Sequence, residues 1–232
     1  MFTEPAVFEL ACVVNNIRHV VVCGHSDCKA INLLYNQHVS LKKSSEEDEK
    51  HSASPLRDWV TTHGSRSMAE FSRLEFAKFR KPLLLNRLNK VEKFEAYVDV
   101  DEKFNVTDKL SMINTLLQME NVKSYRFMRT AAEGQVHVHA FWFDIYTGEI
   151  HIFSRKEKTF IVVNDETLPS LEAELNDICS NLVPSPSATK KKHPRSISFQ
   201  NQASVKNLAE EVRQKFYQHD CASQSLEVHV FR

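Results

Sequence analysis

Two kinds of apolar pattern open the chain and predict its first elements. Over residues 3–17, apolar positions recur at helical spacing, which predicts a helix with one apolar face made of Val7, Leu10, Val14 and Ile17. Residues 18–23 contain three consecutive valines, as is typical of a buried strand. A further helix is expected over residues 27–34. This order predicts an α/β fold with a mainly parallel sheet and helices on both faces.

The middle of the chain is predicted to contain a charged loop followed by helices. Residues 38–53 carry mixed charges and predict a solvated surface loop. Pro55 opens a helix expected over residues 56–63, and a second helix is expected over 67–79. An apolar stripe in that second helix is expected to pack on the core (Met68, Phe71, Leu74 and Phe79). Residues 107–132 predict another helix, which Thr107 or Asp108 could cap.

Residues 136–154 predict a β-hairpin, because two β-rich runs flank the turn sequence Tyr-Thr-Gly-Glu at 146–149. His137 and His139 share one face of the first run. Two histidines at this spacing can ligate a metal, although such residues are more often half-exposed strand positions. A further strand is expected at 159–163 and a helix at 168–182.

Composition changes after Val183 and predicts three parts. Residues 1–183 form the folded domain. Residues 184–203, rich in Pro, Ser and basic side chains, predict a disordered linker. The tail, 204–232, contains a short amphipathic helix over 204–219. The basic run at 190–195 is either a localisation or phosphorylation neighbourhood or, more simply, part of a solvated linker.

The overall composition narrows the class of function. The formal net charge is zero, which speaks against a general nucleic-acid-binding role. No apolar run approaches the ~20 residues of a membrane span. The first 17 residues show neither a signal nor a transit peptide, so a cytoplasmic location is expected. Five irregularly spaced cysteines favour a reducing compartment.

The predicted strand-to-helix turn after residue 23 carries the candidate chemistry. His25 and Cys28 stand three residues apart, at the carboxyl end of a strand, where α/β proteins tend to place their sites. An imidazole and a thiolate are zinc ligands, and a helix N-terminus favours the thiolate. Two ligands alone do not make a tight site. Asp27 lies between them as a helix cap or as a group that orients the ligands.

Several blocks of the sequence resemble the β-class carbonic anhydrases, in particular the animal branch. The resemblance covers roughly residues 1–168. It rests on the following strings: Thr-Glu-Pro-Ala at 3–6, Cys-Val-Val-Asn-Asn-Ile-Arg-His at 12–19, Val-Cys-Gly-His-Ser-Asp-Cys-Lys-Ala at 22–30, Ser-Pro-Leu-Arg at 54–57, Asp-Lys-Leu-Ser at 108–111, Asn-Thr-Leu at 114–116, and Trp-Phe-Asp-Ile-Tyr-Thr-Gly at 142–148.

The resemblance implies a zinc enzyme that hydrates carbon dioxide to bicarbonate by zinc-hydroxide attack. It implies His25 and Cys28 as two of three protein ligands. It also implies a homo-oligomer. The family's first ligand lies in a Cys-x-Asp-x-Arg motif on the neighbouring strand, and its Asp–Arg dyad governs catalysis. This sequence has no such motif, so no catalytic residue is identified and the N-terminal strands of the fold are expected to be missing.

Three readings therefore remain open. The chain is an active carbonate dehydratase by family, an inactive truncated relative, or an interaction protein that works through its tail. Neither Cys23, on the strand, nor Cys12, on the preceding helix, is a good substitute for the missing ligand. The animal branch is often mitochondrial, which would be the alternative location if a missing N-terminus carried a transit peptide.

Overall fold

The computed structural model describes residues 5–15, 17–43, 54–85, 94–125 and 136–180. The described residues up to Val162 belong to one compact unit, and those from Val163 belong to a second, which contains helix α6 (Leu168–Ser180). None of the helices in these ranges is both long and apolar enough to cross a membrane. The predicted linker and tail lie outside the described residues, so the domain boundaries at 183 and 203 stay predictions.

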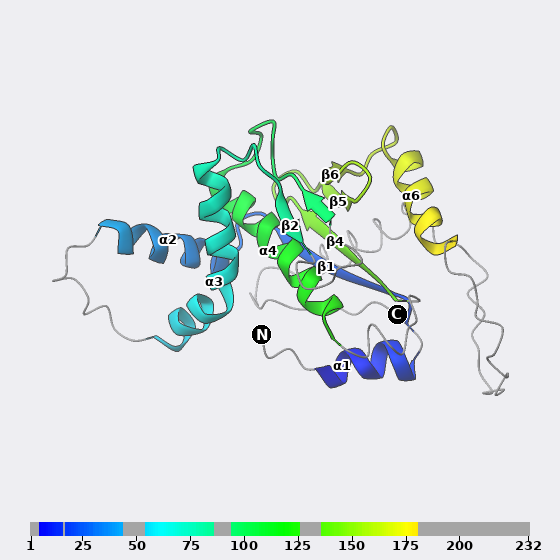
Figure 1. Cartoon of the computed structure of the whole chain (residues 1–232), viewed down its shortest axis with the longest axis horizontal. Coiled ribbons are helices and arrows are strands. Elements are labelled where there is room, and N and C mark those ends of the chain that lie inside the picture. Colours follow the sequence, from blue (N-terminus) through cyan, green and yellow to red (C-terminus); the bar gives the residue numbers. More distant parts are fainter. Residues whose placement is uncertain (1–4, 16, 44–53, 86–93, 126–135, 181–232) are drawn as a thin grey trace. The chain divides into compact units, whose positions relative to one another are not determined.

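A four-stranded sheet forms the centre of the first unit (Figure 1). Its strands, in spatial order, are β1 (His19–His25), β4 (His137–Phe143), β5 (Ile150–Ser154) and β6 (Thr159–Val162). Strand β1 pairs with β4 in parallel, whereas β4 with β5 and β5 with β6 are antiparallel. The α/β class is confirmed, but this sheet is mixed rather than mainly parallel. The reason is local: two tight turns reverse the chain after β4 and after β5.

The first of those turns is the predicted hairpin, which the structure confirms. Residues 141–143 of β4 pair with residues 150–152 of β5. The Asp144 backbone N–H donates to Glu149 O at 2.9 Å, and the Gly148 N–H donates to Asp144 O at 2.8 Å. Gly148 has φ of 72°, a left-handed conformation that glycine adopts without steric cost. This turn fixes the position of Asp144 beside the end of β1.

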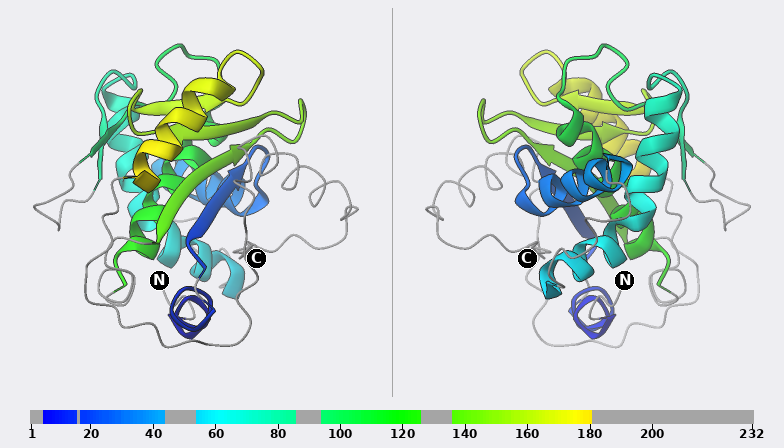
Figure 2. Two further views of the ribbon diagram at one scale, coloured as in Figure 1. Left: turned by 90° about the vertical axis from the view of Figure 1, so that its right-hand side faces the viewer. Right: turned by 90° about the vertical axis from the view of Figure 1, so that its left-hand side faces the viewer.

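Helices cover one face of the sheet, as Figure 2 shows from two sides. Helix α4 (Val106–Lys123) packs on β1 and β4, and both α2 (Lys29–Lys43) and α3 (Pro55–Phe76) pack on α4. The prediction of helices on both faces is thus confirmed for one face. Helix α4 is capped by Asn105, whose side chain accepts from the Asp108 N–H at 2.9 Å, so neither predicted cap residue is the cap.

Two helix boundaries differ from the prediction. Residues 56–63 and 67–79 were expected as separate helices, but α3 runs unbroken through both. Gly64 does not break it, because it is buried and a β-carbon there would meet the side chain of Leu34. Helix α2 extends to Lys43, so the first residues of the predicted surface loop are helical. Packing of α2 and α3 on α4 outweighs the local preference for a loop.

The N-terminal helix turns a different face to the core than its sequence predicts. Helix α1 (Pro5–Glu9) continues into a π-helical turn, η1 (Leu10–Val14). Val7, Leu10 and Val14, predicted to be buried together, are 50%, 55% and 68% exposed. The buried side chains are instead Phe8, Ala11 and Cys12. A π-turn adds a residue per turn, so a 3.6-residue period no longer describes which positions share a face.

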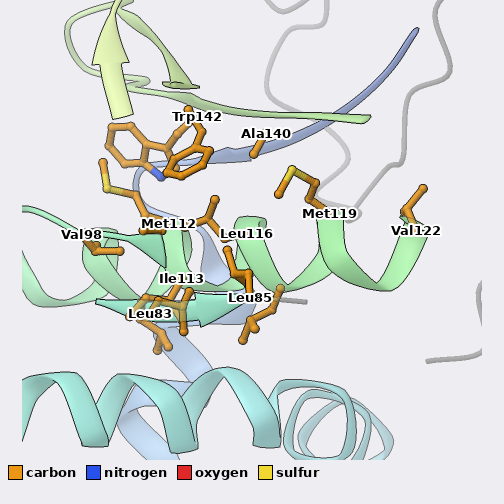
Figure 3. Close-up of a cluster of buried hydrophobic side chains, with 14 of the residues drawn as sticks. Leu83, Leu85, Val98, Met112, Ile113, Leu116, Met119, Val122, Ala140 and Trp142 are labelled. Atoms are coloured by element: carbon orange, nitrogen blue, oxygen red, sulfur yellow. The ribbon is translucent and has the colours of Figure 1, made fainter. Parts of the chain in front are cut away.

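The core gathers around α4, which has ten buried residues (Figure 3). Met112, Ile113 and Leu116 are at most 1% exposed and lie between Trp142 of β4 and the leucines of β2. Strand β2 (Leu83–Leu85) pairs antiparallel with β3 (Phe94–Ala96), a two-stranded ribbon that the sequence analysis did not assign. The predicted stripe of 68–79 is buried in the same core. Because α4 is packed on several sides, it can hold the turn at the end of β1 in a fixed position.

Candidate metal centre at the end of β1

The turn that carries the candidate ligands has the predicted length but lies two residues later in the sequence than predicted. Strand β1 continues through His25, and α2 begins at Lys29, so Ser26, Asp27 and Cys28 alone connect them. The sequence analysis ended the strand at residue 23. The difference arises because the parallel ladder with β4 holds β1 to its last residue. His25 is therefore a strand residue with a fixed backbone.

Gly24 allows α4 to approach this end of β1. A β-carbon built on Gly24 would lie 2.0 Å from Thr115 Oγ1 and 3.2 Å from Trp142 Cδ1. Any side chain at this position would push α4 or β4 away from the strand. The glycine thus lets three elements meet directly beside His25.

His25 and Cys28 do come together, as their spacing suggested. The imidazole and the thiol are hydrogen-bonded to each other. The other ring nitrogen, Nδ1, donates to the Ser26 carbonyl oxygen at 2.8 Å. Because a carbonyl oxygen only accepts, Nδ1 carries the proton and Nε2 is left for Cys28 or for a metal ion.

The electrostatics of the pair raise the pKa of His25 and lower the pKa of Cys28. The pKa of His25 is raised, chiefly by its hydrogen bond to Cys28, against the opposing effect of burial. Burial alone would raise the pKa of Cys28. The hydrogen bond from His25 and the backbone N–H groups of Ile31 and Ala30, at the start of α2, outweigh it and lower that pKa. A thiolate at a helix start is the form that ligates metals.

The Asp27 carboxylate is bonded to two residues of α2. Its carboxylate accepts from Lys29 Nζ at 2.7 Å and from Asn32 Nδ2 at 2.9 Å, and hydrogen bonding to Lys29 is the main reason its pKa is lowered. The backbone at Asp27 has φ of 51°, the left-handed region that Asp tolerates better than most residues. Its contribution visible here is therefore to shape the turn and to begin α2, rather than to touch the His25 ring.

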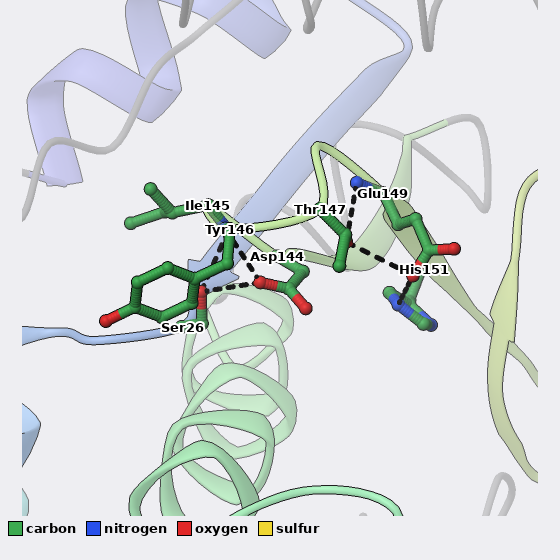
Figure 4. A network of polar contacts seen from close by, with 7 residues as sticks. All are labelled: Ser26, Asp144, Ile145, Tyr146, Thr147, Glu149 and His151. Carbon is green, nitrogen blue, oxygen red and sulfur yellow. Dashed lines mark hydrogen bonds and ion pairs between the residues drawn. The ribbon is translucent and has the colours of Figure 1, made fainter.

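Ser26 ties the turn to the β4–β5 hairpin (Figure 4). Its backbone N–H donates to Phe143 O at 2.9 Å, and its hydroxyl donates to Asp144 Oδ1 at 3.1 Å. The same hydroxyl accepts from the Ile145 N–H at 2.8 Å, while Asp144 Oδ1 also accepts from the Tyr146 N–H at 2.9 Å. Ser26 is 1% exposed. The network fixes the peptide between the two candidate ligands to a neighbouring strand.

Sequence reasoning about ligand types missed Ser26 and Asp144, since neither is a usual zinc ligand in this arrangement. A signal was nevertheless present, because both lie in the two blocks of the resemblance, at 22–30 and 142–148. The structure shows why those blocks belong together: the first makes the turn and the second holds it.

The remaining cysteines of the first unit do not join the pair. Cys23 donates a weak hydrogen bond to the Gly24 carbonyl oxygen at 3.4 Å, and burial raises its pKa to about 12. Cys12 is buried in η1, and burial raises its pKa as well. Burial thus raises the pKa of both thiols, whereas the pKa of Cys28 is lowered.

His137 and His139 meet a third histidine, His19, at the opposite end of β1. His19 Nδ1 and His139 Nε2 are 3.1 Å apart, and the rings of His19 and His137 lie with centroids 5.4 Å apart. Burial, followed by the charge of His19, lowers the pKa of His137 to about 4 and of His139 to about 3. Six residue steps along β1, about 20 Å, separate this cluster from His25.

The donor chemistry fits half of a zinc site. Cys28 and His25 supply a thiolate and an oriented imidazole. Within the described ranges, however, no group of three or more His, Cys, Asp or Glu side chains is arranged to hold a metal ion. Structural zinc takes four protein ligands and catalytic zinc usually three. The described residues therefore fit zinc in kind but fall short in number.

Comparisons with known proteins show which proteins the chain is similar to. The family model described as carbonic anhydrase matches residues 3–150. Beta carbonic anhydrase 1 of Caenorhabditis briggsae is 40% identical over 178 residues, which is 76% of this chain and 64% of that protein. Beta carbonic anhydrase 1 of Caenorhabditis elegans is 41% identical over 178 residues, covering 75% of this chain and 63% of that protein. The chain thus spans less than two thirds of these curated relatives.

Solved structures similar to the chain include two β-carbonic anhydrases. CcaA aligns with a TM-score of 0.46 at 18% identity, covering 69% of this chain and 62% of that one. CafA of Aspergillus fumigatus aligns with a TM-score of 0.41 at 14% identity, covering 75% and 62%.

Proposed function

The chain belongs to the β-class carbonic anhydrase family, and from this premise we propose that it takes part in the zinc-dependent hydration of carbon dioxide to bicarbonate. His25 and Cys28 are the ligands it contributes. The observation that carries this proposal is their mutual hydrogen bond, with Nδ1 of His25 held by the Ser26 carbonyl oxygen. Zinc with a complete ligand set makes bound water nucleophilic at neutral pH, a known property of carbonic anhydrases rather than a finding about this chain.

This chain's own residues perform three tasks at the site. Cys28 presents a thiol that loses its proton more readily, because His25 and the start of α2 lower its pKa. His25 presents Nε2, because Nδ1–H is held by the Ser26 carbonyl oxygen. Ser26 and Asp144 hold the connecting peptide against the hairpin. A third ligand has to come from outside the described residues or from another polypeptide.

Two other functions remain as competing proposals. An inactive relative would keep the fold and the His25–Cys28 pair but turn over no substrate. An interaction protein would work through the tail over 204–219, outside the described residues. A homo-oligomeric state and a cytoplasmic location, or a mitochondrial one, are further proposals that follow from the family.

The test measures zinc content and stopped-flow carbon dioxide hydration on the same purified sample. Cys28→Ala and His25→Ala are compared with Cys23→Ala, a matched cysteine five residues away on β1. We expect zinc to depend on His25 and Cys28 and to be unaffected at Cys23. Zinc content independent of His25 and Cys28 would overturn the proposal. Zinc bound without hydration above the buffer rate would favour the inactive relative.

A further inference from the structure

A buried polar chain joins helix α4 and strand β4 to the backbone of His25. The Ser111 hydroxyl donates to the His25 carbonyl oxygen at 2.8 Å, and the Trp142 indole Nε1–H donates to the Ser111 hydroxyl at 3.2 Å. Ser111 is 4% exposed and Trp142 is fully buried. The serine lies in the second turn of α4. The Trp142–Ser111 bond is buried and the Ser111–His25 bond is partly buried, so leaving either one unmade is costly.

The groups in this hydrogen-bonded series have few other partners available. The single hydroxyl proton of Ser111 is used on His25, and one of its lone pairs is used by Trp142. The indole is held in place by edge-to-face contacts with Phe104 and His151, whose ring centroids lie 5.2 and 5.5 Å away. The direction of the His25 carbonyl group is therefore set by residues more than 80 positions away in the sequence.

The same face of α4 also touches the next part of the turn. Asp108 lies three residues before Ser111 and thus on the same side of the helix. Burial raises the pKa of its carboxyl group, and the nearby Asp27 backbone opposes that shift. Asp27 is the residue with φ of 51°, a conformation that needs support from its surroundings. Ser111 and Asp108 thus face the two residues on either side of Ser26, namely His25 and Asp27.

We propose that Ser111, supported by Trp142, is a positioning residue for the metal ligand His25. The proposal rests on the proposed function for the identity of the ligand, but not for the geometry. Ser111 fixes the carbonyl group at the end of β1, and so the peptide that leads to Ser26. The Ser26 carbonyl oxygen in turn holds Nδ1 of His25 and aims Nε2 at Cys28. Ser111 does not itself reach the reacting atoms.

The first measurement is a Co²⁺ titration of the full chain, followed by the cysteinate-to-cobalt absorbance. Ser111→Ala is compared with Ser67→Ala, a matched control: Ser67 is 1% exposed and its hydroxyl donates to Asn114 of the same helix at 2.9 Å. We expect Ser111→Ala to weaken Co²⁺ binding by about 10- to 100-fold, as for other groups that orient metal ligands, and Ser67→Ala to leave it unchanged. Equal weakening in both variants overturns the proposal, because it would mark a general loss of stability.

The second measurement does not need a metal. The ¹⁵N chemical shifts of the His25 imidazole, assigned by comparison with His25→Ala, report its tautomer and hydrogen bonds. We expect them to change in Ser111→Ala and not in Ser67→Ala. Trp142→Phe keeps the ring and removes only the N–H, so we expect a smaller change in the same direction. Unchanged His25 shifts in Ser111→Ala overturn the proposal.

The two measurements test the proposed function and the role of Ser111 separately. A cobalt absorbance that persists in His25→Ala contradicts the proposed function, because His25 would then not be a ligand. The imidazole shifts still decide whether Ser111 positions that ring.

Discussion

The two ends of strand β1 both carry histidine, and they make opposite use of it. At the carboxyl end, His25 sits beside a thiol, which raises the imidazole pKa. At the amino end, His19, His137 and His139 crowd together, and burial with mutual repulsion lowers the pKa values of the latter two to about 4 and about 3. The first histidine is polarised by a partner of complementary charge, whereas the others are kept neutral.

This contrast shows that residue type and spacing alone do not identify a site. Two histidines at period two, and a histidine and cysteine at period three, are both credible metal ligands on paper. What distinguishes them is the group that each imidazole meets in three dimensions. Four predictions, from the largest expected effect to the smallest, test how far the two ends of β1 differ.

The largest effect is expected from Gly24→Ala at the carboxyl end. The new methyl group would lie 2.0 Å from Thr115 Oγ1, on a β-branched side chain that is itself bonded to the Ser111 carbonyl oxygen at 2.9 Å. We expect a loss of about 3 kcal/mol in the free energy of unfolding, measured by urea denaturation.

Two variants control this prediction. Gly24→Ala combined with Thr115→Ala removes the clash and should recover much of the stability. Gly64→Ala in α3 meets the end of the Leu34 side chain, which can rotate, and alanine is preferred in a helix by about 1 kcal/mol. A similar loss in both single variants would contradict the special closeness of α4 to β1.

The histidines at the amino end of β1 should affect how stability depends on pH. The pKa values of His137 and His139, lowered from 6.5 to about 4 and about 3, mean that the unfolded chain binds protons first as the pH falls. Their contribution to stability is complete above pH 6.5 and is lost as the pH falls below it. We expect His139→Asn to reduce the loss of unfolding free energy between pH 7 and pH 5 by about 2 kcal/mol.

His25→Asn provides the comparison, because its imidazole has the opposite shift. A raised pKa contributes stability below 6.5 that is lost as the pH rises through the folded value, so removing His25 should not flatten the acid limb. The measurement is urea denaturation of both variants across this pH range. If both variants reduce the loss of unfolding free energy at acidic pH equally, the two ends of β1 do not differ in this way.

A medium effect is expected from Ser26→Ala. The substitution leaves the Ile145 N–H without its acceptor and removes the donor to Asp144, so we expect a loss of about 2 kcal/mol in unfolding free energy. Thr147→Ala in the same hairpin removes an exposed hydroxyl that contacts Glu149, and should cost about 0.5 kcal/mol or less. Equal costs would mean that the turn and the hairpin are not coupled.

The smallest effect is expected from Asp27→Asn. Its partner Lys29 is largely exposed, and ion pairs of this kind contribute about 0–1 kcal/mol. Asparagine keeps the tolerance for φ of 51°, so the variant isolates the charge. Thermal unfolding should barely change. A large destabilisation would show that the carboxylate does more at this end of β1 than pair with α2.

Much of the fold followed from local patterns in the sequence. The strand ending beside the ligands, the hairpin at 144–149 and the buried stripe of 68–79 were all predicted, because alternation, glycine in a turn and helical periodicity are local signals. The register of α1 was not, since a π-turn changes the period. The continuity of α3 was not, since packing on α4 overrides the weak local break.

The sequence by itself determined which chemistry is present: a histidine and a cysteine at the end of a strand, within blocks that resemble one family. Tertiary structure alone decided how that chemistry is held. Ser111 and Trp142 reach the His25 carbonyl group, and Asp144 reaches Ser26, from segments far along the chain. The physical reason is that local spacing places ligands near one another, but only packed elements fix the direction of a carbonyl group or the charge of an imidazole.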